Sequence, residues 1–485
     1  MKTSAKHIGL LMAALPAAAA TTPAVHVGDL QFPPLPAFSV PRPERVTLGN
    51  GLTVLLLPDR DLPLVQGTVL IHAGARLEPK EKVGLAAVTA TVMRTGGTAS
   101  QKPDQVDDLL EGIGASLELF AGVDRAGASF SCLSRDLETV LGVLGEVLKA
   151  PALAADRLEV ARAQARALVA RRNDNPAGIT AREFAKAVYG KDSVYARHTE
   201  YATLDAIGRD DLVAFHRANF APNRTVLGLV GDFDPRAARR LLEKSLGGWK
   251  RGAAAGKPSG GWEGGLKPGL YFVDKADVNQ SNVWLGHLGI TSDNPDLFAV
   301  WVMNELFGGG FSARLFSNVR SKKGLAYSVG GFIDDDYDHP ATFRVTMSTK
   351  SETTVAGVQA LEEEIDALLA AAPSGAELKR ARDSILNSFI FRFDTKEKVL
   401  DRQVEYAFFG YPPDFLERCR AGIEKVTAGD VLQVARKYIH KDRLVKVVVG
   451  KSADFGTPLG SLGQTVTAVD ITIPGAPQAK AASTK

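Results

Sequence analysis

The sequence contains little cysteine and no excess of charge of either sign. Cys132 and Cys419 are the only cysteines among 485 residues, which excludes a disulfide framework and a cysteine-based zinc site. We interpret both as small core residues, with a bridge between them as the alternative. Lys and Arg number 58 and Asp and Glu 55, for a net charge of +3. This balance is too small for the basic surface that a nucleic-acid backbone requires.

The motifs of common hydrolases are also missing. The eight histidines form no H-x-x-x-H or H-x-x-E-H pair, and there is no G-x-S-x-G elbow or phosphate-binding glycine loop. The glycines at 308–310 follow a predicted helix and are interpreted as its end. His72 and His287 lie in equivalent predicted strands and are interpreted as structural. Any metal site would therefore have to be assembled from scattered residues.

The N-terminus has the pattern of a secretory signal peptide. Lys2 and Lys6 precede an apolar run at 8–20 and small residues up to Ala24. The run is shorter than a membrane span, and no later segment reaches that length. We therefore expect a signal peptide at 1–24 and a periplasmic or secreted protein.

Composition also divides the rest of the chain. A Pro-rich arm at 25–43 precedes a first domain at 44–249, which opens with a predicted hairpin around Gly49, Asn50 and Gly51. A linker rich in Gly, Ala and Pro covers 250–269, and a second domain covers 270–455. The remaining residues, 456–485, are predicted to be a loosely attached tail.

An internal repeat relates the two domains. Residues 207–232 align without gaps with 426–451, an offset of 219 residues from Ile207 to Val426. Each copy is an amphipathic helix followed by a β-branched strand. We expect an α+β fold of two homologous domains, each a mainly antiparallel sheet with helices packed on one side, joined by the linker into a clamshell.

The segment 48–98 resembles the N-terminal block of the insulinase/pitrilysin (M16) metallopeptidases, and the resemblance extends over about 44–455. In that family a G-L-A-H-x-x-E-H helix supplies two zinc ligands and a general base. Here the stretch is GLAAVTAT at 84–91, so the ligand positions are Ala87 and Thr91 and the base position is Ala90. The helix expected to carry the third ligand, at 160–172, contains no Glu. The family's zinc site is therefore degenerate, and we expect no metal in this chain.

A second family motif is retained at 308–331. In the family, an Arg and a Tyr seven residues later reach the zinc site of the facing domain. Arg320 and Tyr327 have this spacing. A guanidinium can bind a substrate carbonyl and a phenol can donate to a developing oxyanion, so the resemblance implies a catalytic role for both.

These residues suggest the metal-free subunit of a heterodimeric M16 peptidase. Such a subunit would be inactive alone, would pair with a zinc-bearing M16 subunit, and would lend Arg320 and Tyr327 to peptide hydrolysis in the partner. A catalytically inert scaffold or peptide-holding protein of the same shape is the alternative. A third possibility is an active zinc protease with rearranged ligands, which metal analysis of the isolated chain would decide.

Overall fold

Two six-stranded sheets lie at the centres of the two halves of the chain in the computed structural model, which describes residues 40–254, 256, 260–262, 264–265 and 267–476. The predicted signal peptide and most of the Pro-rich arm lie outside these residues. The elements considered below all belong to one compact unit, Val40–Lys485. Among the described residues, no helix is both long enough and apolar enough to cross a bilayer.

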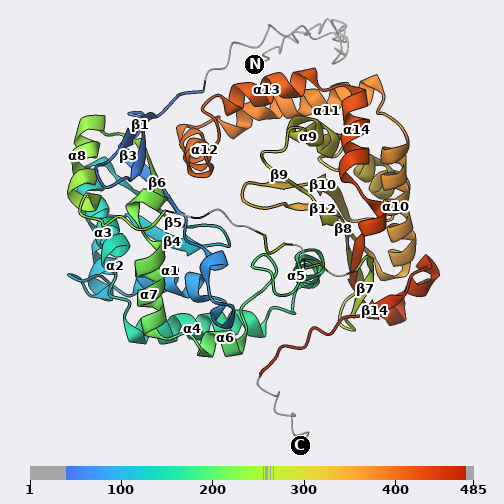
Figure 1. The fold of residues 1–485 in the computed structure, drawn as a ribbon, viewed down its shortest axis with the longest axis horizontal. Helices are drawn as coiled ribbons and strands as arrows, with labels where there is room; N and C mark the ends of the chain where they lie inside the picture. Colours follow the sequence, from blue (N-terminus) through green and yellow to red (C-terminus); the bar gives the residue numbers. More distant parts are fainter. Residues whose placement is uncertain (1–39, 255, 257–259, 263, 266, 477–485) are drawn as a thin grey trace, which may run out of the picture. The chain divides into compact units, whose positions relative to one another are not determined.

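The first sheet has the order β1-β2-β6-β3-β5-β4 (Figure 1). Its strands are β1 (Glu44–Thr47), β2 (Thr53–Pro58), β3 (Leu64–Ile71), β4 (Ser116–Ala121), β5 (Ala126–Leu133) and β6 (Thr225–Gly231). β2 and β6 are parallel, and the other neighbours are antiparallel. The sheet is therefore mixed but mainly antiparallel, as predicted.

The predicted hairpin at the start of this sheet is present, with a different turn. β1 and β2 pair antiparallel, but residues 48–52 connect them, and within the connection only Gly51 has a positive φ, of +89°. The connection is therefore longer than the two-residue type I′ turn that an Asn-Gly pair favours. The Asn50 side chain instead donates to the Leu246 carbonyl at 2.8 Å, which fixes the longer loop against a neighbouring helix.

The first half's own helices bury one face of this sheet. They are α1 (Leu85–Thr95), α2 (Pro103–Gly112), α3 (Leu137–Lys149), α4 (Ala155–Ala170), α6 (Tyr201–Asp205), α7 (Arg209–Asn219) and α8 (Pro235–Leu246). Side chains alternate along the strands: Val54 and Leu56 of β2 face these helices, whereas Leu55 and Leu57 face the other way. This period of two allows both faces of the sheet to be covered.

The second sheet has the order β10-β12-β8-β13-β7-β14. Its strands are β7 (Gly269–Asp274), β8 (Gln280–Leu288), β10 (Ser328–Ile333), β12 (Thr342–Lys350), β13 (Val445–Gly450) and β14 (Val466–Ala468); β9 (Ile290–Thr291) and β11 (Asp335–Asp336) pair separately. The second half's own helices are α9 (Leu297–Phe307), α10 (Thr354–Ala370), α11 (Gly375–Ser388), α13 (Phe415–Lys425) and α14 (Ala428–Tyr438). Figure 1 shows α10 and α14 beside the sheet.

The repeat found in the sequence relates equivalent elements. Both ends of α14 lie 219 residues beyond those of α7, and β13 follows α14 as β6 follows α7. Asp211 and Asp430 are matched in the alignment and act alike, each accepting a backbone N–H near its helix start at 2.8 Å. The aligned residues therefore perform the same local task in both halves.

The C-terminal segment is more closely integrated than predicted. Within the described part of the tail, β14 pairs in parallel with β7 and extends the second sheet. Val469 and Ile471 then pack on Val449, and the Asn173 side chain donates to the Ile471 carbonyl at 2.7 Å. The prediction of loose attachment was wrong because composition does not reveal a strand added to the sheet edge.

Each half also contributes a helix to the other half's sheet. α5 (Pro176–Tyr189), from the first half, packs on the face of β8 and β13 that α10 and α14 leave open. α12 (Lys396–Phe409), from the second half, packs on β2, β3 and β6. The start of α12 lies 220 residues beyond the start of α5. The exchange therefore follows the sequence repeat.

Both cysteines are free and buried. Cys132 lies in β5 within the first core and Cys419 lies in α13 within the second. The structure confirms their interpretation as separate core residues.

Candidate functional site

The degenerate zinc positions lie on an intact helix. α1 carries an exposed Ala87, a buried Ala90 and a half-buried Thr91. The Thr91 hydroxyl donates to the Ala87 carbonyl at 3.0 Å, so the one polar group of the three is engaged by the helix backbone. None of these side chains offers the imidazole or carboxylate that the family's zinc chemistry uses.

A buried carboxylate stabilises the start of this helix. Glu78 accepts the backbone N–H groups of Gly84 at 3.0 Å and Ala86 at 2.6 Å. Burial raises the pKa of Glu78, while the two N–H groups oppose the rise. The carboxylate therefore satisfies helix donors that lack intrahelical partners. The helix has kept its scaffold although the sequence has lost the zinc ligands.

The helix expected to supply the third ligand is α4, and its surface is covered by local ion pairs. Arg162 pairs with Glu159 at 2.8 Å, Arg157 with Asp104 at 3.0 Å, and Arg166 with Asp205 at 2.5 Å. Glu159, which directly precedes the stretch 160–172, is therefore already engaged. These arginines are partly buried and are engaged by carboxylates of the same chain.

Arg320 and Tyr327 are brought together by a π-helix that spans Phe316–Lys322. Arg320 Nε donates to the Tyr327 carbonyl oxygen at 2.9 Å, and its guanidinium lies over the Phe316 ring at 4.5 Å from the centroid. The Tyr327 N–H donates to the Ser348 carbonyl at 2.9 Å. The guanidinium is thus held by a hydrogen bond and a cation–π contact, on the unusual helix type that often marks functional sites.

Both side chains are accessible on this surface. Arg320 is exposed and Tyr327 retains 51% of its accessible area. Phe311, at 83% exposure, stands edge-on to Phe316 with ring centroids 4.9 Å apart. Two exposed aromatic rings and a cation therefore lie in the segment between α9 and β10. Such a surface suits a peptide or a protein partner.

Glycines permit the backbone contacts beside this motif. α9 ends at Gly308, as predicted for the run at 308–310. A Cβ at Gly308 would lie 2.1 Å from the Gly331 backbone nitrogen, so the chain after α9 can approach β10 only without a side chain. Gly308 therefore both follows the end of α9 and allows the backbone there to pack closely on β10.

An edge strand ends the sheet in each half. β4 lies at the edge of the first sheet, and β10, which begins directly after Tyr327, lies at the edge of the second. Edge strands offer unpaired backbone groups to an added peptide strand. Tyr327 therefore lies at the start of such an edge.

The histidines interpreted as structural have structural partners. His287 Nε2 accepts a hydrogen bond from the His440 N–H at 2.9 Å. His287 Nδ1 then carries the proton and donates to the Leu288 carbonyl at 2.7 Å. Burial lowers the pKa of His287 to about 4. His72 stacks on Phe408 of α12 at 3.8 Å between ring centroids. The structure confirms that both pack within the protein.

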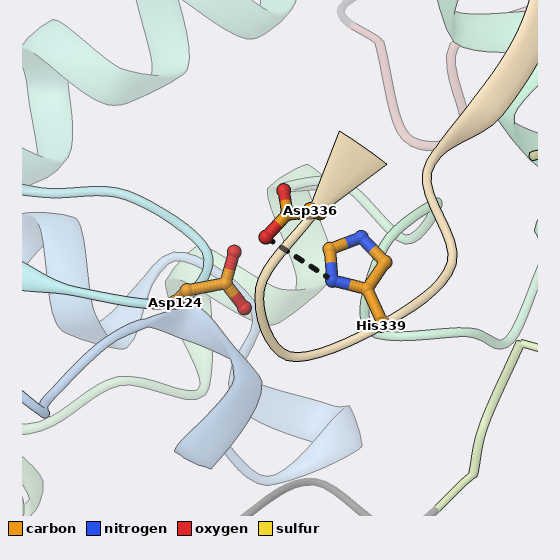
Figure 2. A group of neighbouring side chains, drawn as sticks. All are labelled: Asp124, Asp336 and His339. Carbon is orange, nitrogen blue, oxygen red and sulfur yellow. Dashed lines mark ion pairs between the residues drawn. The ribbon is translucent and has the colours of Figure 1, made fainter. Parts of the chain in front are cut away.

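A different group of side chains was missed by the sequence analysis. Asp124, Asp336 and His339 place potential ligand atoms within 4.8 Å of one another, and Figure 2 shows the three side chains converging. Asp124 lies between β4 and β5, whereas Asp336 ends β11 and His339 follows it. The acidic run DDDYDH at 334–339 was a signal for part of this group. Asp124 could not have been assigned to it without the tertiary structure.

A cavity of about 710 Å³ lies elsewhere. Its wall includes Glu183 and Lys186 of α5, Tyr271 of β7 and Val447 of β13. Arg320, Tyr327 and the three side chains of Figure 2 do not line it. The cavity therefore belongs to the packing of α5 on the second sheet.

Comparison with known proteins agrees with this architecture. The sequence profile described as "Insulinase (Peptidase family M16)" matches residues 54–200, and that described as "Peptidase M16 inactive domain" matches 206–385. The chain belongs to the M16 family. Positions 87, 90 and 91, where the resemblance places two zinc ligands and the general base, hold Ala, Ala and Thr.

Individual relatives share most of the chain. An uncharacterized zinc protease of Rickettsia bellii is 25% identical over 417 residues, covering 83% of this chain and 96% of the relative. The crystal structure of a peptidase M16 inactive domain from Pseudomonas fluorescens is 25% identical, with a TM-score of 0.73, covering 84% of this chain and 98% of that one. The periplasmic protease PqqL of Escherichia coli shares the fold at 15% identity and a TM-score of 0.71, covering 85% of this chain and 46% of PqqL.

Proposed function

We propose that this chain is the subunit of a heterodimeric M16 peptidase that binds no metal at the family's catalytic zinc site, and that it contributes Arg320 and Tyr327 to the active site of a zinc-bearing partner. The observation that carries the proposal is the contrast between the two motifs. α1 has lost every zinc-site side chain, whereas Arg320 and Tyr327 remain exposed at the correct spacing. A chain with only the second motif requires another to supply the first.

The geometry suits both residues to this role. Arg320 Nε is held by the Tyr327 carbonyl, so the terminal nitrogens of the guanidinium can receive a substrate carbonyl or carboxylate. The Tyr327 hydroxyl can donate to the oxyanion that develops as the peptide bond is attacked. Zinc in the partner would polarise that carbonyl and activate the attacking water.

The cellular location of the chain is part of the same proposal. The pattern at 1–24 favours export to a bacterial-type periplasm or beyond, and one solved neighbour is a periplasmic protease. The partner would then be an exported M16 chain with an H-x-x-E-H helix. Full-length, uncleaved protein in the cytosol would contradict this part.

Reconstitution tests the catalytic role. The chain is purified from its native cell with its partner, and peptide cleavage is measured for each subunit alone and for the pair. We expect peptide cleavage only when both subunits are present. In the pair, Arg320→Ala or Tyr327→Phe should lower turnover about a hundredfold, which is the scale seen when one oxyanion donor is removed. Arg217→Ala, at an exposed position on α7, is the matched control and should keep full activity.

A scaffold that holds peptides without catalysing is the second candidate. The observation that favours it is that Arg320 already has a hydrogen-bond acceptor and an aromatic ring within its own chain. If both variants assemble normally and retain wild-type turnover, the catalytic role is refuted and the scaffold remains.

A further inference from the structure

Two carboxylates and an imidazole meet where the β4–β5 turn approaches the loop after β11. His339 Nδ1 lies 3.8 Å from Asp336 Oδ1, beyond hydrogen-bond distance, and the Asp124 carboxylate faces both groups (Figure 2). His339 retains only 6% of its accessible surface. Its Nδ1 and Asp124 Oδ1 are buried without a hydrogen-bond partner among the described residues. Buried polar atoms normally have a partner, which can be a protein group, an ordered water or an ion.

Neighbouring charges do not satisfy this group. Asp338 is paired with Arg76 at 2.9 Å, Asp334 pairs with Arg344, and Asp335 accepts the Trp301 indole N–H at 3.0 Å. In the described part of the chain, neither Asp124 nor Asp336 has a Lys or Arg in ion-pair contact. Two negative side chains therefore converge without a cation between them, which is unfavourable unless a proton or a metal ion intervenes.

The elements that carry the group are held in place. The Asp336 carboxylate accepts the Tyr337 N–H at 2.7 Å, and its carbonyl accepts the Ser292 N–H at 2.8 Å. The β4–β5 turn is closed by a 2.8 Å bond from Gly122 N–H to the Arg125 carbonyl. Tyr195 stacks on the His339 ring at 3.6 Å between centroids. The segments that carry the three ligands are thus held in place, so that only small side-chain movements are needed to close on an ion.

We propose that Asp124, Asp336 and His339 form a binding site for a divalent transition-metal ion of the zinc or manganese type. One imidazole nitrogen and two carboxylate oxygens form a donor set suited to these ions, whereas calcium and magnesium favour all-oxygen sites. Side-chain movements that shorten the present separations would bring each donor to about 2.0–2.2 Å from the ion. The part-exposed carboxylates leave room for water ligands.

This site differs from the degenerate family site in residues and in role. Its ligands come from both halves of the chain, so a bound ion would tie the β4–β5 turn to the loop after β11 and stabilise their contact. The proposal replaces the expectation of a metal-free chain, and it is independent of Arg320 and Tyr327. Loss of metal binding would leave their proposed role intact, and loss of that role would leave this site intact.

Metal titration of the isolated full chain tests the proposal. After chelator treatment and dialysis, Zn²⁺ or Mn²⁺ is added separately, with Mg²⁺ as the comparison. Bound metal is counted by mass spectrometry and affinity is measured by calorimetry. We expect one equivalent of Zn²⁺ or Mn²⁺ per chain and a rise in melting temperature with metal concentration. Absence of binding by both ions overturns the proposal.

Conservative variants locate the ion. Asp124→Asn and His339→Gln should each weaken binding by more than about a hundredfold and abolish the metal-dependent rise in melting temperature. Without metal, Asp124→Asn should melt no lower than the wild type, because it removes repulsion between carboxylates. Asp442→Asn, an exposed acid in the second half, is the matched control. Unchanged affinity in both site variants places the ion elsewhere and overturns the assignment.

Discussion

The two halves share a fold but have diverged in chemistry and in how they are covered. The first half keeps α1 and its Glu78 cap but has no zinc ligand there, whereas the second presents Arg320 and Tyr327 on an exposed π-helix. Their exchanged helices differ as well. α5 docks with the aromatic Phe184, and α12 docks with Val404 over Gly228. A repeat thus preserves backbone architecture while individual side chains are free to change.

The largest expected effect concerns the exchanged helix α5. Phe184 is 2% exposed and meets Trp284 edge-on at 5.5 Å between centroids. Phe184→Ala should lower the free energy of unfolding by about 4 kcal/mol, from lost burial and the cavity left behind. Val404→Ala, at the comparable place on α12, should cost about 2 kcal/mol because fewer methyl groups are removed. Denaturant unfolding measures both free energies. Equal losses would contradict the expectation that α5 depends more on its single aromatic side chain than α12 does on Val404.

The next largest change in unfolding free energy is expected at Ala90 of α1, where the family's motif has a glutamate. Ala90 is 2% exposed, so Ala90→Glu would bury a carboxylate without a metal or cation and should cost about 3 kcal/mol of unfolding free energy. Ala87→Glu, on the same helix but exposed, should be nearly neutral. Thermal or denaturant unfolding of the pair tests this. A neutral Ala90→Glu would mean that this part of α1 can still accommodate a charged group.

The close contact of α12 with the first sheet predicts a smaller cost. A Cβ at Gly228 would lie 2.5 Å from Val404 Cγ2 and 3.0 Å from Leu400. Gly228→Ala should therefore destabilise the protein by about 2 kcal/mol through overpacking. Gly142→Ala, in α3 with no atom within 4 Å of the added Cβ, should instead stabilise it by about 0.5–1 kcal/mol. Opposite signs in unfolding experiments are the expected result.

The smallest expected change in unfolding free energy concerns the start of α11, which we compare with the start of α4. α11 begins with Ser374 and Glu377 bonded reciprocally, and Arg314 donates to Glu377 at 2.8 Å, whereas α4 has no side-chain cap. The hydrogen bond from Arg314 is the largest cause that lowers the pKa of Glu377, to about 2. Because Glu377 is partly exposed, Glu377→Gln should cost only about 1 kcal/mol at pH 7.

The pH dependence of that variant has a definite sign. A lowered carboxyl pKa stabilises the folded state above the ordinary value near 4.5, and the stabilisation is lost as pH falls towards about 2. The unfolding free energies of wild type and Glu377→Gln should therefore differ at pH 7 and converge below about pH 4.5. A difference that stays constant with pH would show that the charge of Glu377 does not stabilise α11.

The sequence by itself determined the repeat, the family and which residues stand at the positions of the family's zinc-site motif. These follow from local pattern: the period of apolar residues defines a helix and a strand twice, and four missing ligand or base functions can be recognised one position at a time. The π-helix around Arg320 was not predicted, although the seven-residue spacing of Arg320 and Tyr327 was recognised in the sequence.

Tertiary structure alone decided what distant segments do together. α5 and α12 are ordinary amphipathic helices in sequence, and their exchange depends on which sheet face each half leaves open. The short strand β14 becomes visible only by its pairing with β7. Asp124 joins Asp336 and His339 across more than two hundred residues. Contacts between residues so far apart depend on the folded path of the chain, which local periodicity does not encode.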